Sequence, residues 1–158
     1  MQEPSRYITR EFRKADVFSV SALISTVFHT CIRQYYLPEG VDNFLSLIDP
    51  LKLEERLDTG QFGYVAETET EIVGMILIRN TNHITLLFVD RQHHHTGIGK
   101  TLFSHAYDAV FSGKSSVEKM TVNSSPFAVG FYTAMGFTET APAHYKDGMK
   151  IIPMELVP

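Results

Sequence analysis

The residues of this chain whose types and spacing could do chemistry lie in a polar loop that ends in two glycines. Residues 90–96 read Asp-Arg-Gln-His-His-His-Thr, and Gly97 and Gly99 follow them. When such a loop joins a strand to a helix, several backbone N–H groups and the positive end of the helix dipole point at one place, where an anion can bind. The pattern therefore predicts a site for a phosphate-bearing cofactor.

A strand and a helix must position this loop. Residues 84–89 form a nearly unbroken apolar run, which is typical of a strand buried on both faces. After the loop, apolar residues recur with the spacing of one face of an α-helix. These residues are Ile98, Leu102, Phe103, Ala106 and Val110. Another short strand is predicted over residues 117–122, and because a helix connects the two strands we expect them to be parallel neighbours.

The rest of the chain completes the predicted domain. Apolar patterns predict, in chain order, a strand, two helices, three strands, the helix described above, a strand, a helix and two strands. No repeat or linker interrupts them, so we expect a single domain over residues 1–158. The fold class is α/β, with a central mixed sheet of about seven strands flanked by about four helices. Asp16 is expected to cap the first helix, and Ser125 the last, with Phe127 and Phe131 on the core face.

Composition narrows the classes of function. A net charge of −4 argues against nucleic acid as the main partner and mildly favours a cationic substrate such as an amine. The chain has no run of about 18 apolar residues, and residues 1–6 lack the apolar core of a secretory signal, so neither a membrane span nor export is expected. The single cysteine, Cys31, cannot form an internal disulfide, which indicates a reducing, cytoplasmic location.

Three kinds of phosphate-binding loop contain glycines of this type, and two of them fit poorly. The nucleoside-triphosphate loop matches Gly-Lys-Thr at residues 99–101 but requires another glycine where the chain has His94. The dinucleotide fingerprint requires glycine in place of Leu102. The adjacent histidines at 93–95 also suggest a metal, but neighbours in one loop rarely face one ion, so no metal site is predicted.

The third kind is the one that the chain resembles. Residues 94–99, His-His-Thr-Gly-Ile-Gly after a strand ending in Val89, resemble the acetyl-CoA loop of the GNAT superfamily of N-acetyltransferases. In that superfamily the loop reads Arg/Gln-x-x-Gly-x-Gly/Ala, so histidine at position 94 is a departure. A second block is similar as well, with Asn123 after a strand, Tyr132 late in a helix, and Gly-Phe at 136–137 opening the next strand.

The resemblance implies a GNAT-like fold and an enzyme that uses acetyl-CoA. Such an enzyme transfers the acetyl group to a primary amine by direct attack on the thioester, without a covalent enzyme intermediate. The acceptor would be a small-molecule or peptide amine, and dimers are common in the superfamily, so a homodimer is compatible with it. The alternative is a non-catalytic acyl-CoA-binding or sensor domain, which His94 and the lack of a carboxylate at position 83 keep open.

The resemblance also implies roles for particular residues. Tyr132 is the expected general acid, because at about 100° per residue it is rotated away from the core face of Phe127 and Phe131. His83 stands where the superfamily often has a carboxylate, and its ordinary pKa near 6.5 suits a base, although a solvent-facing histidine at the strand end explains it slightly better. The cofactor is expected to contact Leu87, Phe88, Val89, His94, His95, Thr96, Gly97, Ile98, Gly99, Lys100, Asn123, Phe127 and Tyr132. The acceptor is expected near Tyr35, Tyr36, Glu39 and Phe44.

Overall fold

The computed structural model describes residues 6–112 and 116–158, and these form one mixed sheet with helices on both faces. The strands are β1 (Ile8–Glu11), β2 (Phe62–Glu67), β3 (Ile72–Arg79), β4 (His83–Val89), β5 (Met120–Ser124), β6 (Thr138–Glu139), β7 (His144–Lys146) and β8 (Met149–Leu156). Their spatial order is β1-β2-β3-β4-β5-β8-β6, and β7 pairs with β8. The expectation of no export signal rests on residues 1–6, and residues 1–5 lie outside the described part.

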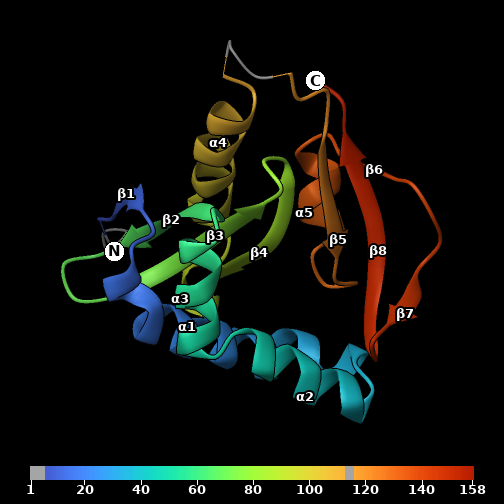
Figure 1. Cartoon of the computed structure of the whole chain (residues 1–158), viewed down its shortest axis with the longest axis horizontal. Helices are drawn as coiled ribbons and strands as arrows, with labels where there is room; N and C mark the ends of the chain where they lie inside the picture. The colour runs from blue at the N-terminus through green and yellow to red at the C-terminus, as the bar shows by residue number, and fades with distance from the viewer. Residues whose placement is uncertain (1–5, 113–115) are drawn as a thin grey trace.

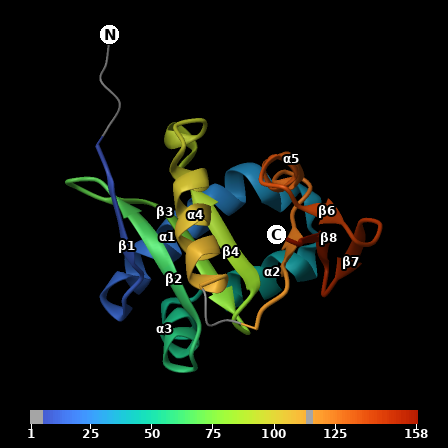
Figure 2. The ribbon, with the colours of Figure 1, turned by 90° about the horizontal axis from the view of Figure 1, so that it is seen from above.

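The helices divide between the two faces of the sheet. They are α1 (Val17–Val27), α2 (Pro38–Leu47), α3 (Pro50–Asp58), α4 (Ile98–Val110) and α5 (Val129–Ala134). Figure 1 shows α4 above the sheet and α1 and α2 below it, and Figure 2 shows the same arrangement from above. The core accordingly forms two apolar clusters, one packed under α1, α2 and α3 and the other under α4 and α5.

Strand β4 is not buried evenly on both faces, which corrects the sequence-based expectation. Ile84, Leu86 and Phe88 are buried, whereas Leu87 and the other alternate residues of β4 are only partly buried. The pairing with β3 shifts between Leu86 and Ile84, so Thr85 forms a β-bulge without a partner on β3. All residues from Ile84 to Val89 line a cavity, so neither face of β4 is packed as in a fully buried strand.

The parallel pairing of β4 with β5 is confirmed, but it is short. Only His83 with Thr121 and Ile84 with Val122 are in register, and β5 itself begins at Met120, later than the sequence pattern predicts. Beyond these two pairs β5 continues alongside β8 and leaves β4. Figure 1 shows β5 and β8 standing apart from the first four strands. The backbone edge of β4 from Leu86 onward therefore has no strand partner on this side.

Helical turns extend α1 into a longer stretch, Lys14–Tyr35, through a π-helical turn at Phe28–Ile32. This stretch has 22 residues and a mean hydropathy of 1.5 in its most apolar part, so by length and composition it could cross a membrane. Half of that part is buried within the fold, however, and a core helix passes the same test. The stretch therefore does not contradict the expectation of no membrane span.

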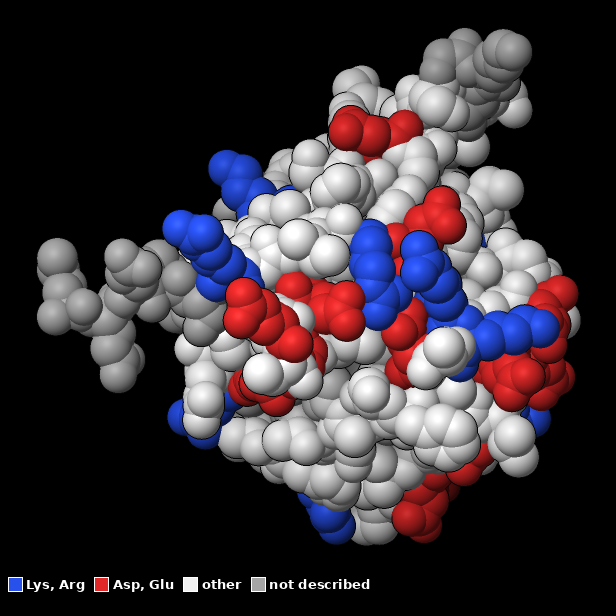
Figure 3. All heavy atoms as spheres, turned by 90° about the vertical axis from the view of Figure 1, so that its left-hand side faces the viewer, with Lys and Arg blue, Asp and Glu red and all other residues white. Residues whose placement is uncertain are grey.

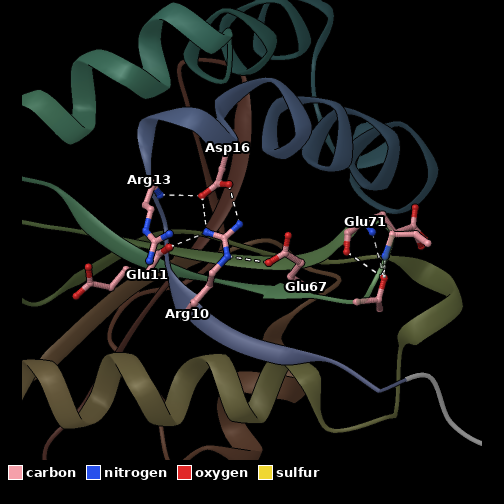
Figure 4. Close-up of polar contacts among 8 residues, drawn as sticks. Arg10, Glu11, Arg13, Asp16, Glu67 and Glu71 are labelled. Atoms are coloured by element: carbon pink, nitrogen blue, oxygen red, sulfur yellow. Dashed lines mark hydrogen bonds and ion pairs between the residues drawn. The ribbon is translucent and has the colours of Figure 1, made fainter.

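A partly buried ion-pair network joins the N-terminal strand to the turn before α1 and to β2 (Figure 4). The Arg10 guanidinium donates to both carboxylate oxygens of Asp16, each at 2.9 Å, and to Glu67 at 2.8 Å. Asp16 also accepts the backbone N–H of Arg13 at 2.8 Å. The predicted cap of α1 by the Asp16 side chain is therefore wrong: the carboxylate is held by Arg10 and by the preceding turn.

Acidic and basic side chains alternate on the face that carries β1. Figure 3 shows this face, on which blue and red side chains lie close to one another instead of gathering by sign. Lys14 pairs with Asp58 in this part of the fold, so a surface ion pair also links the turn before α1 to the end of α3. On this face, acidic side chains are therefore partly neutralised by basic neighbours, in keeping with the small net charge of −4.

Candidate active site

A cavity of about 780 Å³ lies where β4 and β5 diverge. Its lining comes from both apolar clusters, with Tyr36 and Phe44 from one face of the sheet and Ile98 and Tyr132 from the other. Since each cluster packs on its own face, a cavity lined by both passes from one side of the sheet to the other. Two molecules that enter from opposite faces can therefore meet beside β4.

A row of unpaired backbone donors borders this cavity. Among the described residues, no hydrogen bond uses the amide N–H groups of residues 95–100, which form the last part of the loop and the first turn of α4. Gly97 precedes the helix with φ of 86°, a left-handed conformation that a residue with Cβ adopts only with strain. Nothing lies within 4 Å of where its Cβ would be. These donors and the dipole of α4 suit a diphosphate, as coenzyme A carries.

His94 holds the loop to the end of β4. Its ring Nε2 donates to the carbonyl oxygen of Val89 at 2.8 Å, and its ring packs against Phe127 with centroids 6.0 Å apart. Arginine or glutamine, which the superfamily has here, also carries side-chain N–H donors that could reach such a carbonyl. The departure at position 94 is thus compatible with an ordered loop.

The segment before α5 is a turn and not the first part of the helix. The Ser125 hydroxyl accepts the N–H of Ala128 at 3.2 Å, and α5 begins only at Val129. Phe127 therefore does not share a helical face with Phe131, and it is 48% exposed instead of buried in the core. The prediction that Ser125 caps the helix and that Phe127 faces the core is wrong for this reason.

Tyr132, which was expected to point away from the core, is the buried aromatic residue of α5. It is 4% exposed, and its ring contacts those of Phe131 and Phe137 with centroids 5.4 Å away in both cases. Burial raises the pKa of its hydroxyl well above the ordinary value, so the group keeps its proton at neutral pH. Within the described part of the chain, no hydrogen bond engages that hydroxyl, and the residue lines the cavity.

His83 lies at the first residue of β4, outside the cavity lining. Its Nδ1 is 2.7 Å from the Thr121 hydroxyl oxygen on β5. Burial, together with the charges of Arg79 and Lys146, lowers the pKa of His83 to about 4. The ring is therefore neutral at pH 7 and a weaker base than a free histidine.

Most of the expected cofactor residues line the cavity, and a few expected site residues do not. Of the residues expected at the cofactor, only Thr96 is absent from the lining. Among those expected at the acceptor, Tyr36 and Phe44 line it, whereas Tyr35 and Glu39 do not. Phe44 stacks on Phe28 with centroids 4.4 Å apart.

Several lining residues were missed by the sequence analysis. Val27 precedes the π-helical turn and Ile32 is its last residue, and no periodic signal reveals that turn. Thr85 reaches the cavity because of the β-bulge, which depends on pairing with a distant strand. Phe131 was recognised as apolar but assigned to the core.

Comparison with solved structures identifies the class of fold. A GCN5-related N-acetyltransferase from Rhodopseudomonas palustris is similar over 100% of this chain and 99% of its own, with 18% identity and a TM-score of 0.83. The PaiA N-acetyltransferase from Thermoplasma acidophilum, solved in complex with coenzyme A, is similar over 97% and 99%, with 17% identity and a TM-score of 0.77. A GNAT-family acetyltransferase from Staphylococcus aureus Mu50 is similar over 96% and 99%, with 16% identity and a TM-score of 0.72. The fold is that of the GNAT N-acetyltransferases.

The family follows from the sequence. The sequence model of one protein family, the acetyltransferase (GNAT) domain, matches residues 32–158, which is most of the chain. The protein belongs to the GNAT acetyltransferase family, so the resemblance and the α/β fold class inferred from the sequence are confirmed.

Proposed function

We propose that this protein is an N-acetyltransferase that moves the acetyl group of acetyl-CoA to a primary amine. The observation that carries the proposal is the row of unpaired amides at residues 95–100, next to a cavity that crosses the sheet. The amides suit the diphosphate of coenzyme A, and the opposite opening gives an amine access to the acyl group. The relative from Thermoplasma acidophilum, solved with coenzyme A, supports the same cofactor.

The chain provides three kinds of group to the donor. The amides of residues 95–100 hold the diphosphate, and the unpaired edge of β4 from Leu87 to Val89 offers backbone partners to the extended arm. Asn123 contacts the arm from β5, with Phe127 near the loop. When bound, acetyl-CoA supplies a thioester whose carbonyl carbon an amine can attack.

The transfer needs three proton movements. As the bond from nitrogen to the acyl carbon forms and the bond from that carbon to sulfur breaks, Tyr132 donates its hydroxyl proton to the departing thiolate. The nitrogen, now bonded to the acyl carbon, releases its second proton, which returns Tyr132 to its neutral form. A backbone N–H near Phe88 or Val89 stabilises the negative charge on the acyl oxygen. Before the attack, the amine must lose a proton, which costs about 4.6 kcal/mol at pH 7 for an ordinary alkylamine. That proton passes through water either to His83 or to bulk solvent.

The acceptor enters from the face of α1 and α2. Tyr36 and Phe44 line the cavity there, and Tyr35 and Glu39 lie on the adjoining turn and the start of α2. The proposal places the protein in the cytoplasm, which is supported by the free, buried thiol of Cys31.

The first test is the melting temperature with and without saturating acetyl-CoA, with NAD and ATP as controls. A ligand at about 100 times its dissociation constant adds roughly 2.7 kcal/mol to stability, which is several degrees for a domain of this size. A shift with acetyl-CoA alone supports the proposed donor site, and a shift with ATP alone contradicts it. Thiol release during incubation with a panel of primary amines then tests transfer itself.

The alternative function is acyl-CoA binding without catalysis. Such a domain would show the melting shift but no thiol release above the hydrolysis background with any amine. The lining of the cavity by residues from the second face of the sheet favours the enzyme, because a sensor that binds only acyl-CoA needs no space for an acceptor.

A further inference from the structure

Four basic side chains gather near the beginning of β4. Arg56 is in the last turn of α3, Arg79 ends β3, His83 begins β4, and Lys146 ends β7. Arg79 and His83 are paired in the sheet, and the charge of Arg79 acts on both Arg56 and His83. Segments that are far apart in the sequence thus bring the positive charges of Arg56, Arg79 and Lys146 to one place, beside the neutral ring of His83.

This cluster has no acidic partner among the described residues. No ion pair there includes Arg56, Arg79 or Lys146. The Nε of Arg79 is buried without a hydrogen-bond acceptor, and the Arg56 guanidinium has only the Thr85 hydroxyl, at 3.2 Å. Burial and the charge of Arg79 lower the pKa of Arg56, which reports the same lack of a nearby anion. Guanidinium groups that lose water without gaining a carboxylate or phosphate are energetically unfavourable.

The cluster adjoins the cavity through Thr85. This residue lines the cavity and accepts the hydrogen bond from Arg56, so the guanidinium lies at its margin. Thr85 precedes Leu87 by two residues, about 7 Å along an extended strand. The acyl group is proposed to lie at this part of β4. A short molecule can therefore place an acidic group beside Arg56 and its amine beside the acyl group.

We propose that Arg56 and Arg79 bind the carboxylate of an amino acid whose amine is the acetyl acceptor. This inference rests on the proposed function and specifies its substrate class: an amine that carries an acid group, not a polyamine. Arginine suits the role because its planar guanidinium can donate two parallel hydrogen bonds to a carboxylate. The net charge of −4 suggests a weak preference for a cationic substrate. The positive charge at the margin of the cavity favours an anionic group there instead.

The test compares amino acids with their decarboxylated counterparts on the full-length protein. The pairs are β-alanine with ethylamine, 4-aminobutyrate with propylamine, and lysine with 1,5-diaminopentane. We expect kcat/KM to be at least tenfold higher for the acid in one or more pairs. Arg56→Gln should reduce kcat/KM of the preferred acid at least tenfold, mainly through KM, and change that of its counterpart less than threefold. Arg56→Lys should retain part of the preference.

A control variant and a binding measurement keep the outcomes separate. Lys52→Gln, on the same helix but exposed and paired only with Glu55, should leave every ratio unchanged. Binding of each compound to the complex with coenzyme A, measured by calorimetry, gives the same comparison without turnover. Equal or better use of the decarboxylated amines, or equal effects of Arg56→Gln on both members of a pair, overturns the carboxylate site and leaves the proposed function intact. Failure of the proposed function would instead appear as no melting shift with acetyl-CoA.

Discussion

The hydroxyl of Tyr132 keeps its proton at neutral pH because the side chain is buried among aromatic rings. A general acid that protonates the leaving thiolate contributes about 10²- to 10⁴-fold to the rate. Tyr132→Phe removes the hydroxyl and keeps the ring, so we expect kcat to fall by roughly 10²-fold or more. Affinity for acetyl-CoA, measured by the melting shift, should stay within a factor of about three, because the diphosphate is proposed to bind to backbone amides.

A Tyr107→Phe variant serves as the control for loss of a tyrosine hydroxyl, because Tyr107 lies on α4 outside the cavity lining. It should retain full turnover. Unchanged kcat in Tyr132→Phe would contradict the assignment of the general acid.

His83 affects stability in a direction that its pKa determines. Its pKa is lowered from the ordinary 6.5 to about 4, so between these values the unfolded chain binds more protons than the folded one. The contribution of the neutral ring to the free energy of unfolding is complete above pH 6.5. It is lost as the pH falls toward 4, and the loss is at most about 3 kcal/mol. His83→Gln should therefore flatten the decrease in unfolding free energy over this pH range, measured by urea denaturation.

The same variant identifies the acceptor of the amine proton. A tenfold or larger loss of kcat in His83→Gln, with the KM values unchanged, would assign that proton to His83. An unchanged kcat would assign that proton to solvent. If the unfolding free energy of His83→Gln decreased between pH 6.5 and 4 as steeply as that of the unaltered protein, the pKa of His83 would not be lowered.

At the scale of elements, the start of α2 packs backbone to backbone on the turn between β7 and β8. Leu37 donates to the carbonyl oxygen of Gly148 at 2.9 Å, and Tyr36 forms a β-bridge with Met149. A Cβ on Gly40 would lie 2.1 Å from the carbonyl oxygen of Gly148. This contact holds the segment that carries Tyr36 next to β8, and so it shapes the side of the cavity at which the acceptor is proposed to bind.

Gly40→Ala should therefore separate α2 from the turn. We expect a loss of roughly 1–3 kcal/mol in unfolding free energy and a higher KM for the amine, with little change in the affinity for acetyl-CoA. Ser46→Ala, an exposed change on the same helix, is the matched control and should affect neither quantity. Equal behaviour of the two variants in denaturation and kinetics would contradict the close packing at Gly40.

At the scale of the whole molecule, the ion pair of Asp16 with Arg10 ties the edge strand β1 to α1 and, through Glu67, to β2. Burial opposes ionisation of Asp16, but the hydrogen bonds from Arg10 and from the Arg13 amide outweigh it and lower its pKa. Its contribution to stability is therefore present at neutral pH and is lost as the pH falls below the ordinary range of an aspartate.

Asp16→Asn should lower the unfolding free energy at pH 7 by roughly 1–3 kcal/mol, because Arg10 then loses its charged partner. The difference should shrink in acid, where the carboxylate is protonated in both states. Glu71→Gln, an exposed change, is the control, and the melting shift with acetyl-CoA should be the same size in all three proteins because the network is remote from the cavity. A constant difference across pH would contradict the role of the charge.

The sequence by itself determined the local parts of the protein. The strand over residues 84–89, the glycine loop and the helix from Ile98 follow from periodicity and backbone chemistry, which depend on neighbouring residues alone. This stretch and the second block, from Asn123 to Phe137, together carried the resemblance to the GNAT family, which the family match confirms. By contrast, β7 was missed, because its three residues are all exposed and show no apolar alternation.

Only the tertiary structure decided how these parts meet. The β-bulge at Thr85, the early divergence of β4 from β5 and the placement of His83 outside the cavity all depend on pairing between strands distant in the chain. The approach of Arg56 to Thr85 and the lining of one cavity from both faces of the sheet arise in the same way. Such features are sums of non-local contacts, and no pattern within a single segment encodes them.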